Sequence, residues 1–164
     1  MSIKSYTTED DVRAILGVSS DELGDETLAL EVYESNLLLE LEDVNANLQA
    51  DYFVVTAIAV GSRTATESKF HRTLRLFAAY AVARQLISSL PLFGPKDISD
   101  GKAMVSRFSD SPYKETIKEV RTQYDKFRVS LTVAYGEYKT TGSTAYARPY
   151  LSVSSPSTDP VTGA

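Results

Sequence analysis

Residues 64–90, TATESKFHRTLRLFAAYAVARQLISSL, decide the fold that we predict for this chain. Thr64 and Thr66 are residue types that begin helices, and Pro91 follows where a helix has to stop. Two neighbouring apolar stripes run along this helix: Phe70, Leu74, Phe77 and Ala81 form one, and Leu76, Tyr80, Ala83, Ile87 and Leu90 form the next. A helix that is apolar over so wide an arc lies at the centre of a bundle or is shared between subunits.

The segments before this helix predict two more helices. Thr8, followed by Asp11 three residues later, is typical of a capping box, and a short helix from there ends at Gly17. The acids at 21–26 suit the positive end of a second helix, which we expect to run to about Leu48. Its apolar stripe alternates steps of three and four residues and consists of Leu30, Tyr33, Leu37, Leu41, Val44 and Leu48.

The segment at 52–60, YFVVTAIAV, is rich in β-branched and aromatic residues, and its pattern fits either a buried strand or a helical turn. We favour a short strand, or an extended link, over these residues. Further along the chain, Ser111-Pro112 is a strong start signal for a last helix. The apolar stripe of that helix keeps three-four spacing and consists of Tyr113, Ile117, Val120, Tyr124, Phe127, Leu131 and Ala134.

These patterns predict a mainly α fold: a small helical bundle of one short and three long helices, with an extended C-terminal arm. We place the body at 1–135 and the arm at 136–164. The arm holds 10 Ser/Thr, 3 Gly and 3 Pro among 29 residues. Because this composition buries too little apolar surface to offset the entropy of ordering it, we expect another protein to hold the arm. Its candidate anchors are Tyr146, Arg148, Tyr150, Leu151 and Val153.

The composition argues against catalysis and bound cofactors. The chain has no cysteine and one histidine, His71, which removes thiol nucleophiles and nearly all zinc sites. We interpret His71 as a surface or subunit-contact residue. The segment KDISDGK at 96–102 resembles a cation loop but lacks the alternating acids of an EF-hand, so we predict a turn centred on Asp100-Gly101. We therefore expect no enzyme activity, no cofactor, no metal ion and no membrane span.

Charge is distributed unevenly along the chain. Residues 1–60 hold 13 acids and 2 bases, whereas residues 61–139 hold 8 acids and 14 bases. Two interpretations are open at this point. Complementary faces could meet between neighbouring copies in a ring, or the two halves could form two solvated faces of no consequence for assembly.

A DNA-binding regulator is the alternative function. The stretch DDVRAILGVSSDEL at 10–23 resembles a helix-turn-helix, with Gly17 in the turn. Its second helix would begin with Asp21, Glu22, Asp25 and Glu26, which phosphates repel. Electrostatics therefore argues against this alternative.

Three stretches make the chain resemble the adaptor, or head-tail connector, proteins of tailed bacteriophages: YTTEDDVRAILGVSSDEL at 6–23, LFAAYAVARQLI at 76–87 and ISDGKAMVSRFSDSPYKETI at 98–117. The resemblance covers roughly residues 6–135. It implies a homo-oligomeric ring, expected to be a dodecamer, that is made in the host cytoplasm and joins the head-tail junction of the virion. It also implies that the C-terminal extension docks on the portal protein and that the lower surface receives stopper or tail proteins.

The resemblance further implies that DNA passes through the ring without sequence-specific contact. On this interpretation Glu31, Glu34 and Glu42 form an acidic channel wall that repels phosphate and lets DNA slide. The candidate subunit or tail-side contacts are Arg72, Arg75, Arg84, Ile98, Lys102 and Met104.

Overall fold

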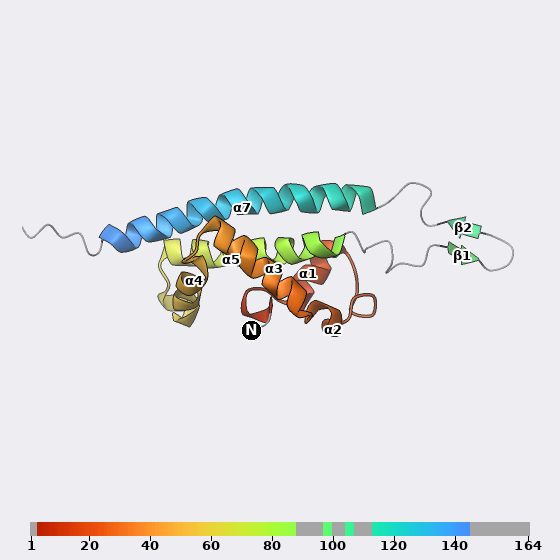
Figure 1. Ribbon diagram of the computed structural model, residues 1–164, viewed down its shortest axis with the longest axis horizontal. Coiled ribbons are helices and arrows are strands. Elements are labelled where there is room, and N and C mark those ends of the chain that lie inside the picture. Colours follow the sequence, from red (N-terminus) through yellow and green to blue (C-terminus); the bar gives the residue numbers. More distant parts are fainter. Residues whose placement is uncertain (1–2, 88–96, 100–103, 107–112, 145–164) are drawn as a thin grey trace, which may run out of the picture.

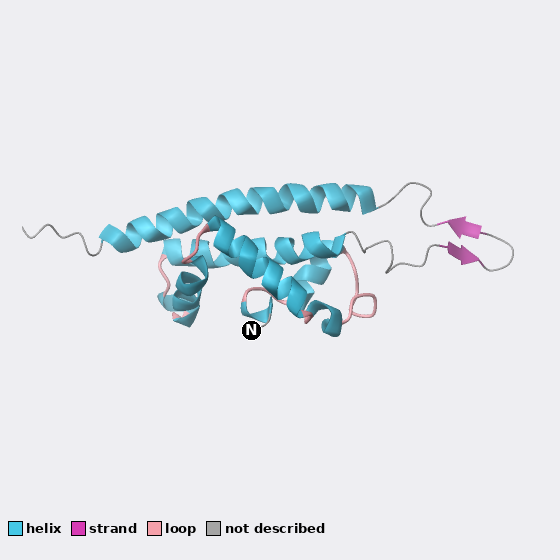
Figure 2. Ribbon diagram, in the orientation of Figure 1, coloured by secondary structure: helices cyan, strands magenta, loops and turns pink. Residues whose placement is uncertain are grey.

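The computed structural model describes residues 3–87, 97–99, 104–106 and 113–144 (Figure 1). Helices dominate this part of the chain, as Figure 2 shows. They are α1 (Glu9–Leu16), α2 (Asp25–Leu28), α3 (Glu31–Val44), α4 (Leu48–Ala57), α5 (Ala65–Leu86) and α7 (Tyr113–Thr144), with short 3-10 helices η1 (Ile3–Ser5) and η2 (Val60–Ser62). The mainly α class predicted from the sequence is confirmed.

Helix α5 is the centre of the fold and contacts α1, α3, α4 and α7 (Figure 1). It begins with a capping box, in which the Thr64 hydroxyl accepts a hydrogen bond from the Glu67 amide and the Glu67 carboxylate accepts one from the Thr64 amide. Its buried side chains are Phe70, Leu74, Phe77, Ala78, Ala79, Ala81, Val82, Ala83 and Leu86. The wide apolar arc predicted for this helix therefore does face neighbours on several sides.

Helix α7 lies along α5 and is held by aromatic contacts. Phe70 stacks on Tyr138, with ring centroids 5.1 Å apart, and Phe77 meets Tyr124 at 5.4 Å. The 32 residues of α7 span about 48 Å at the usual helical rise, so the helix runs the length of the body. Members of its predicted stripe that are buried or packed against the core are Ile117, Val120, Tyr124, Phe127, Leu131 and Ala134.

The prediction of a strand or extended link at 52–60 is wrong, because α4 covers this segment as far as Ala57. The buried residues of α4 are Leu48, Tyr52 and Val55, whose spacing of four and three is helical. The sequence pattern placed Leu48 in the preceding helix. Without Leu48, the apolar residues at 52–60 fit a strand as well as a helix. The two helices are separated at Asn45, whose side-chain oxygen accepts a hydrogen bond of 2.9 Å from the Asn47 amide and so closes a local turn.

The predicted second helix is also interrupted near its start. Helix α2 is a single turn that ends at Leu28, and α3 begins at Glu31. Leu30, which was expected on the buried stripe, is exposed, whereas Leu37 and Leu41 are buried as expected. The capping box of α1 at Thr8 and its end at Gly17, with a left-handed φ of 69°, match the prediction.

The C-terminal arm does not begin at Gly136, because α7 continues to Thr144. The hydroxyls of Thr140 and Thr141 donate to the carbonyls of Gly136 and Glu137, four residues earlier, at 2.8 and 2.9 Å. The proposed anchors at 146–153 lie outside the described residues.

A hairpin joins α5 to α7, with β1 (Asp97–Ser99) antiparallel to β2 (Met104–Ser106) and Ile98 opposite Val105. The predicted turn at Asp100-Gly101 falls between these strands and lies outside the described residues.

Two leucines on α3 should differ in how much free energy of unfolding is lost when each is replaced by alanine, because one is buried in the core and the other is exposed. Leu41 is 1% exposed and Leu39 is 64% exposed. Leu41→Ala should lower the free energy of unfolding by about 2 to 5 kcal/mol, because it leaves a cavity. Leu39→Ala should lower it by less than about 0.5 kcal/mol. Urea denaturation of both variants at low protein concentration measures the difference, and equal losses would contradict the assignment.

Candidate functional site

The described residues contain no group of three or more His, Cys, Asp or Glu side chains placed to hold a metal ion. None of the helices in this part of the chain is long and apolar enough to cross a membrane. The features that remain as candidates are surfaces, and two of them stand out by their exposed apolar side chains.

The first surface is a groove that runs over α5 between α1 and α7. Two cavities, of about 500 and about 390 Å³, lie along it and share Ala14, Ile15 and Tyr80. The apolar floor consists of Ile15, Leu76, Ala79, Tyr80 and Val120. Leu76 is 40% exposed there, and it is the one large apolar side chain of α5, as described from Ala65 to Leu86, that is exposed. We call this surface the α5 groove.

Charged side chains stand on both rims of the α5 groove. On the α1 side, Arg75 donates to the Asp11 carboxylate at 3.1 Å, and Arg72 is exposed beside it. Burial acts to raise the pKa of Asp11, but hydrogen bonds from Thr8 and the charge of Arg75 outweigh it and lower that pKa. On the α7 side, the rim carries the exposed Glu119. The groove therefore has one basic and one acidic edge.

His71 lies where this groove meets a third cavity, of about 250 Å³, beside η1. Its ring stacks on Tyr52, with centroids 5.1 Å apart and planes 13° from parallel. Burial, and then the charges of Arg63 and Arg75, lower the pKa of His71 below its usual value of 6.5. The imidazole is therefore neutral at pH 7 and acts here as a packed aromatic ring.

The second surface is the outward side of α3. Val32 and Leu39 are 53% and 64% exposed, and their separation of seven residues, about two turns, puts them on one line. Glu31 and Glu42, both exposed and about three turns apart, flank that line on one side. We call these four residues the α3 ridge. Glu34, the third acid predicted to face a channel, is half-buried.

The groove and the ridge lie on opposite sides of α5. The Gln85 side chain of α5 accepts a hydrogen bond of 3.2 Å from Asn36 of α3, which marks the side of α5 that faces α3. Leu76 lies nine residues earlier, about two and a half turns, and therefore points the opposite way. In Figure 1, α3 crosses in front of α5 and α1 lies behind it.

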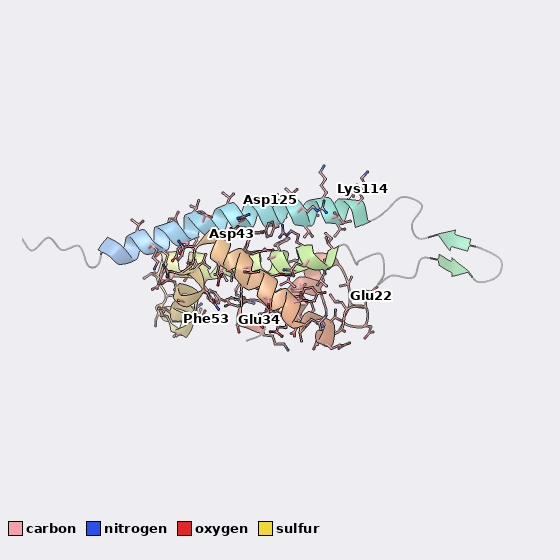
Figure 3. All side chains as sticks on the ribbon, viewed as in Figure 1. Glu22, Glu34, Asp43, Phe53, Lys114 and Asp125 are labelled. Carbon is pink, nitrogen blue, oxygen red and sulfur yellow. The ribbon has the colours of Figure 1, made fainter. Side chains whose placement is uncertain are left out.

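Many charges of the two halves pair within the same chain. Asp11, Glu40, Asp43 and Asp51, all from the acidic half, bind Arg75, Arg84, Arg128 and Lys139 of the basic half. Figure 3 shows Asp43 at the side of α3 that faces α7, while Lys114 projects away from the body. Neither of the two interpretations of the charge distribution included this outcome. It leaves few unpaired charges on the groove and ridge.

The predicted contact residues do not form one surface. Arg75 belongs to the groove rim, whereas Arg84 binds Glu40 at 2.6 Å and lies 4.0 Å over the ring of Tyr124. Ile98 and Met104 lie in the hairpin strands, and Lys102 lies outside the described residues. Arg72, like Arg75, is exposed on the groove rim.

The segment that resembles a helix-turn-helix has no recognition helix. After Gly17 the chain forms turns, and α2 is four residues long. Arg13 is buried and fixes this region: its Nε donates to the Leu23 carbonyl at 2.9 Å, and its guanidinium also binds Asp10 and Asp25. The hydrogen bond from Arg13 lowers the pKa of Asp25.

Comparison of the chain with models of protein families, with curated proteins and with solved structures found no match.

The environment of His71 predicts a measurable titration. Because the chain has one histidine, its imidazole resonances can be followed by NMR without ambiguity. We expect a pKa below 6.5. Below pH 6.5 the unfolded chain then binds more protons than the folded one, so the free energy of unfolding should fall as pH drops toward the folded-state pKa. His71→Phe keeps the stacked ring and should lose this fall, and a native pKa of 6.5 or above would contradict the account.

Proposed function

We propose that this chain is a structural adaptor subunit, whose copies associate head to tail into a ring at the head-tail junction of a tailed bacteriophage. The ring would join the portal to the stopper or tail proteins and extend the DNA channel. The sequence resemblance supports the biological setting. The observation that carries the structural part is the presence of two unlike exposed surfaces, the α5 groove and the α3 ridge, on opposite sides of one helix.

Opposed, unlike surfaces favour a particular kind of assembly. A contact between identical patches gives a closed two-fold dimer, whereas a contact between two different patches leaves one of each unsatisfied and continues to the next copy. Such a series ends only when rotation between copies closes it into a ring. The dodecamer remains the expected size on the strength of the resemblance.

Glu31 and Glu42, which the sequence placed on the channel wall, are assigned here to a contact between proteins. Val32 and Leu39 are exposed between Glu31 and Glu42. A channel wall would leave these apolar side chains in water, whereas a protein contact buries them. We therefore assign the outward side of α3 to a protein contact and leave the channel lining to other surfaces of the ring.

The alternative of a DNA-binding regulator loses support from the local structure. The residues after Gly17 form turns held by the buried Arg13, and the exposed side chains there include Asp21, Glu22 and Glu26. A regulator should bind duplex DNA with an affinity that falls steeply as salt increases. We expect no such binding at low salt.

Native mass spectrometry tests the proposed function. The chain, 18.0 kDa per copy, is mixed with the assembled portal ring encoded in the same genome. We expect a complex in which many copies bind one portal ring, because each bound copy offers a surface to the next. A portal ring that stays bare, or that carries a single copy at saturating protein, would contradict the proposal. A duplex DNA fragment of similar mass serves as the control partner and should remain unbound.

A further inference from the structure

We propose that the α3 ridge of one copy sits in the α5 groove of the next copy. This inference depends on the proposed head-to-tail assembly and names the two surfaces that meet in it. The occupant of the groove is therefore a second copy of this chain, presented through Val32 and Leu39.

The apolar parts of the two surfaces are alike in kind, and each surface offers two apolar positions. Val32 and Leu39 stand about 10 Å apart along α3, at a rise of about 1.5 Å per residue. The groove offers two adjoining cavities, one over Leu76 and one beside Val120, joined at Ile15 and Tyr80. A single row of side chains on a helix can therefore enter the groove with one residue in each cavity. Docking removes apolar area on both sides from water.

The charges set the direction in which the ridge docks. The side chain of Arg72, on the α1 side of the groove, has no hydrogen bond or ion pair with the residues that the structure describes. Glu119 stands on the α7 side. The ridge is equally one-sided, because Glu31 and Glu42 flank it on one side and the neutral Asn36 lies on the other. One orientation turns the glutamate side of the ridge toward the α1 side of the groove and brings Glu42 beside Arg72.

The reverse orientation turns the glutamate side of the ridge toward Glu119, where like charges repel. Two further charges beside these surfaces are already paired. Arg75 binds Asp11 on the groove rim, and Asp43 of α3 binds Arg128 of its own copy. The free charges therefore select a single docking direction, as a ring of identical contacts requires.

Disulfide trapping tests the contact directly, because the natural chain contains no cysteine. Leu39→Cys and Leu76→Cys are placed in two differently tagged full-length chains, which are mixed and mildly oxidised. We expect the mixed disulfide to form several-fold more than either homodimer. The matched control replaces the ridge residue by Val54→Cys, which is exposed on α4 outside the ridge. A mixed yield no greater than that of the Val54 control overturns the inference.

A charge exchange gives a second readout that does not depend on cysteines. Arg72→Glu should weaken self-association about tenfold without unfolding the protein, since Arg72 is exposed and unpaired in the described structure. Adding Glu42→Arg to the same chain should restore association, because every contact then regains an opposite-charge pair. Arg121→Glu, an exposed base on the outer side of α7, is the control and should have little effect.

The outcomes separate this inference from the proposed function. Normal assembly on the portal, combined with no effect of Arg72→Glu and no trapping of Leu39 to Leu76, overturns the docking contact and leaves the adaptor function standing. A chain that stays monomeric at millimolar concentration and on the portal ring overturns both.

Discussion

Helix α5 is buried on several sides at once, and the positions of the other helices follow from its contacts. Phe70 and Phe77 pack against aromatic rings of α7, and Gln85 and Arg84 bind side chains of α3. These contacts fix α7 and α3 around the same helix. The remaining strip of α5, centred on Leu76, is left open between α1 and α7 and forms the floor of the groove.

Polar contacts then hold the outer elements in place and pair many of the charges. The Tyr135 hydroxyl donates to Asp51 at 2.6 Å, and Lys139 binds the same carboxylate, which ties α7 to α4. Burial, and then Asp51, raise the pKa of Tyr135 to about 12, so the phenol stays protonated and keeps donating. Arg13 similarly holds the turns after α1. With these pairs made, Arg72, Glu31 and Glu42 are among the few charges still directed outward at the two surfaces.

The sequence predicted the parts of the fold that local pattern determines. The capping box at Thr8, the start of α5 at Thr64 and the stripes of α5 and α7 could be identified because spacing and start signals agree there. The break at Asn45 could not, since it depends on a side-chain hydrogen bond to the backbone within a segment of continuous helical spacing. The α5 groove and the α3 ridge could be predicted from the sequence only in part. Arg72 was predicted as a contact, but the apolar Val32 and Leu39 were not predicted as part of any surface, because exposure follows from tertiary packing.

The central claim is that neighbouring copies meet through unlike faces. Electron microscopy of the assembled particle tests it most directly, because it shows how each copy is related to the next. The account predicts cyclic symmetry, with α3 of every copy against α1, α5 and α7 of its neighbour. Neighbours related by a two-fold axis, with the same face of both copies in contact, would contradict it.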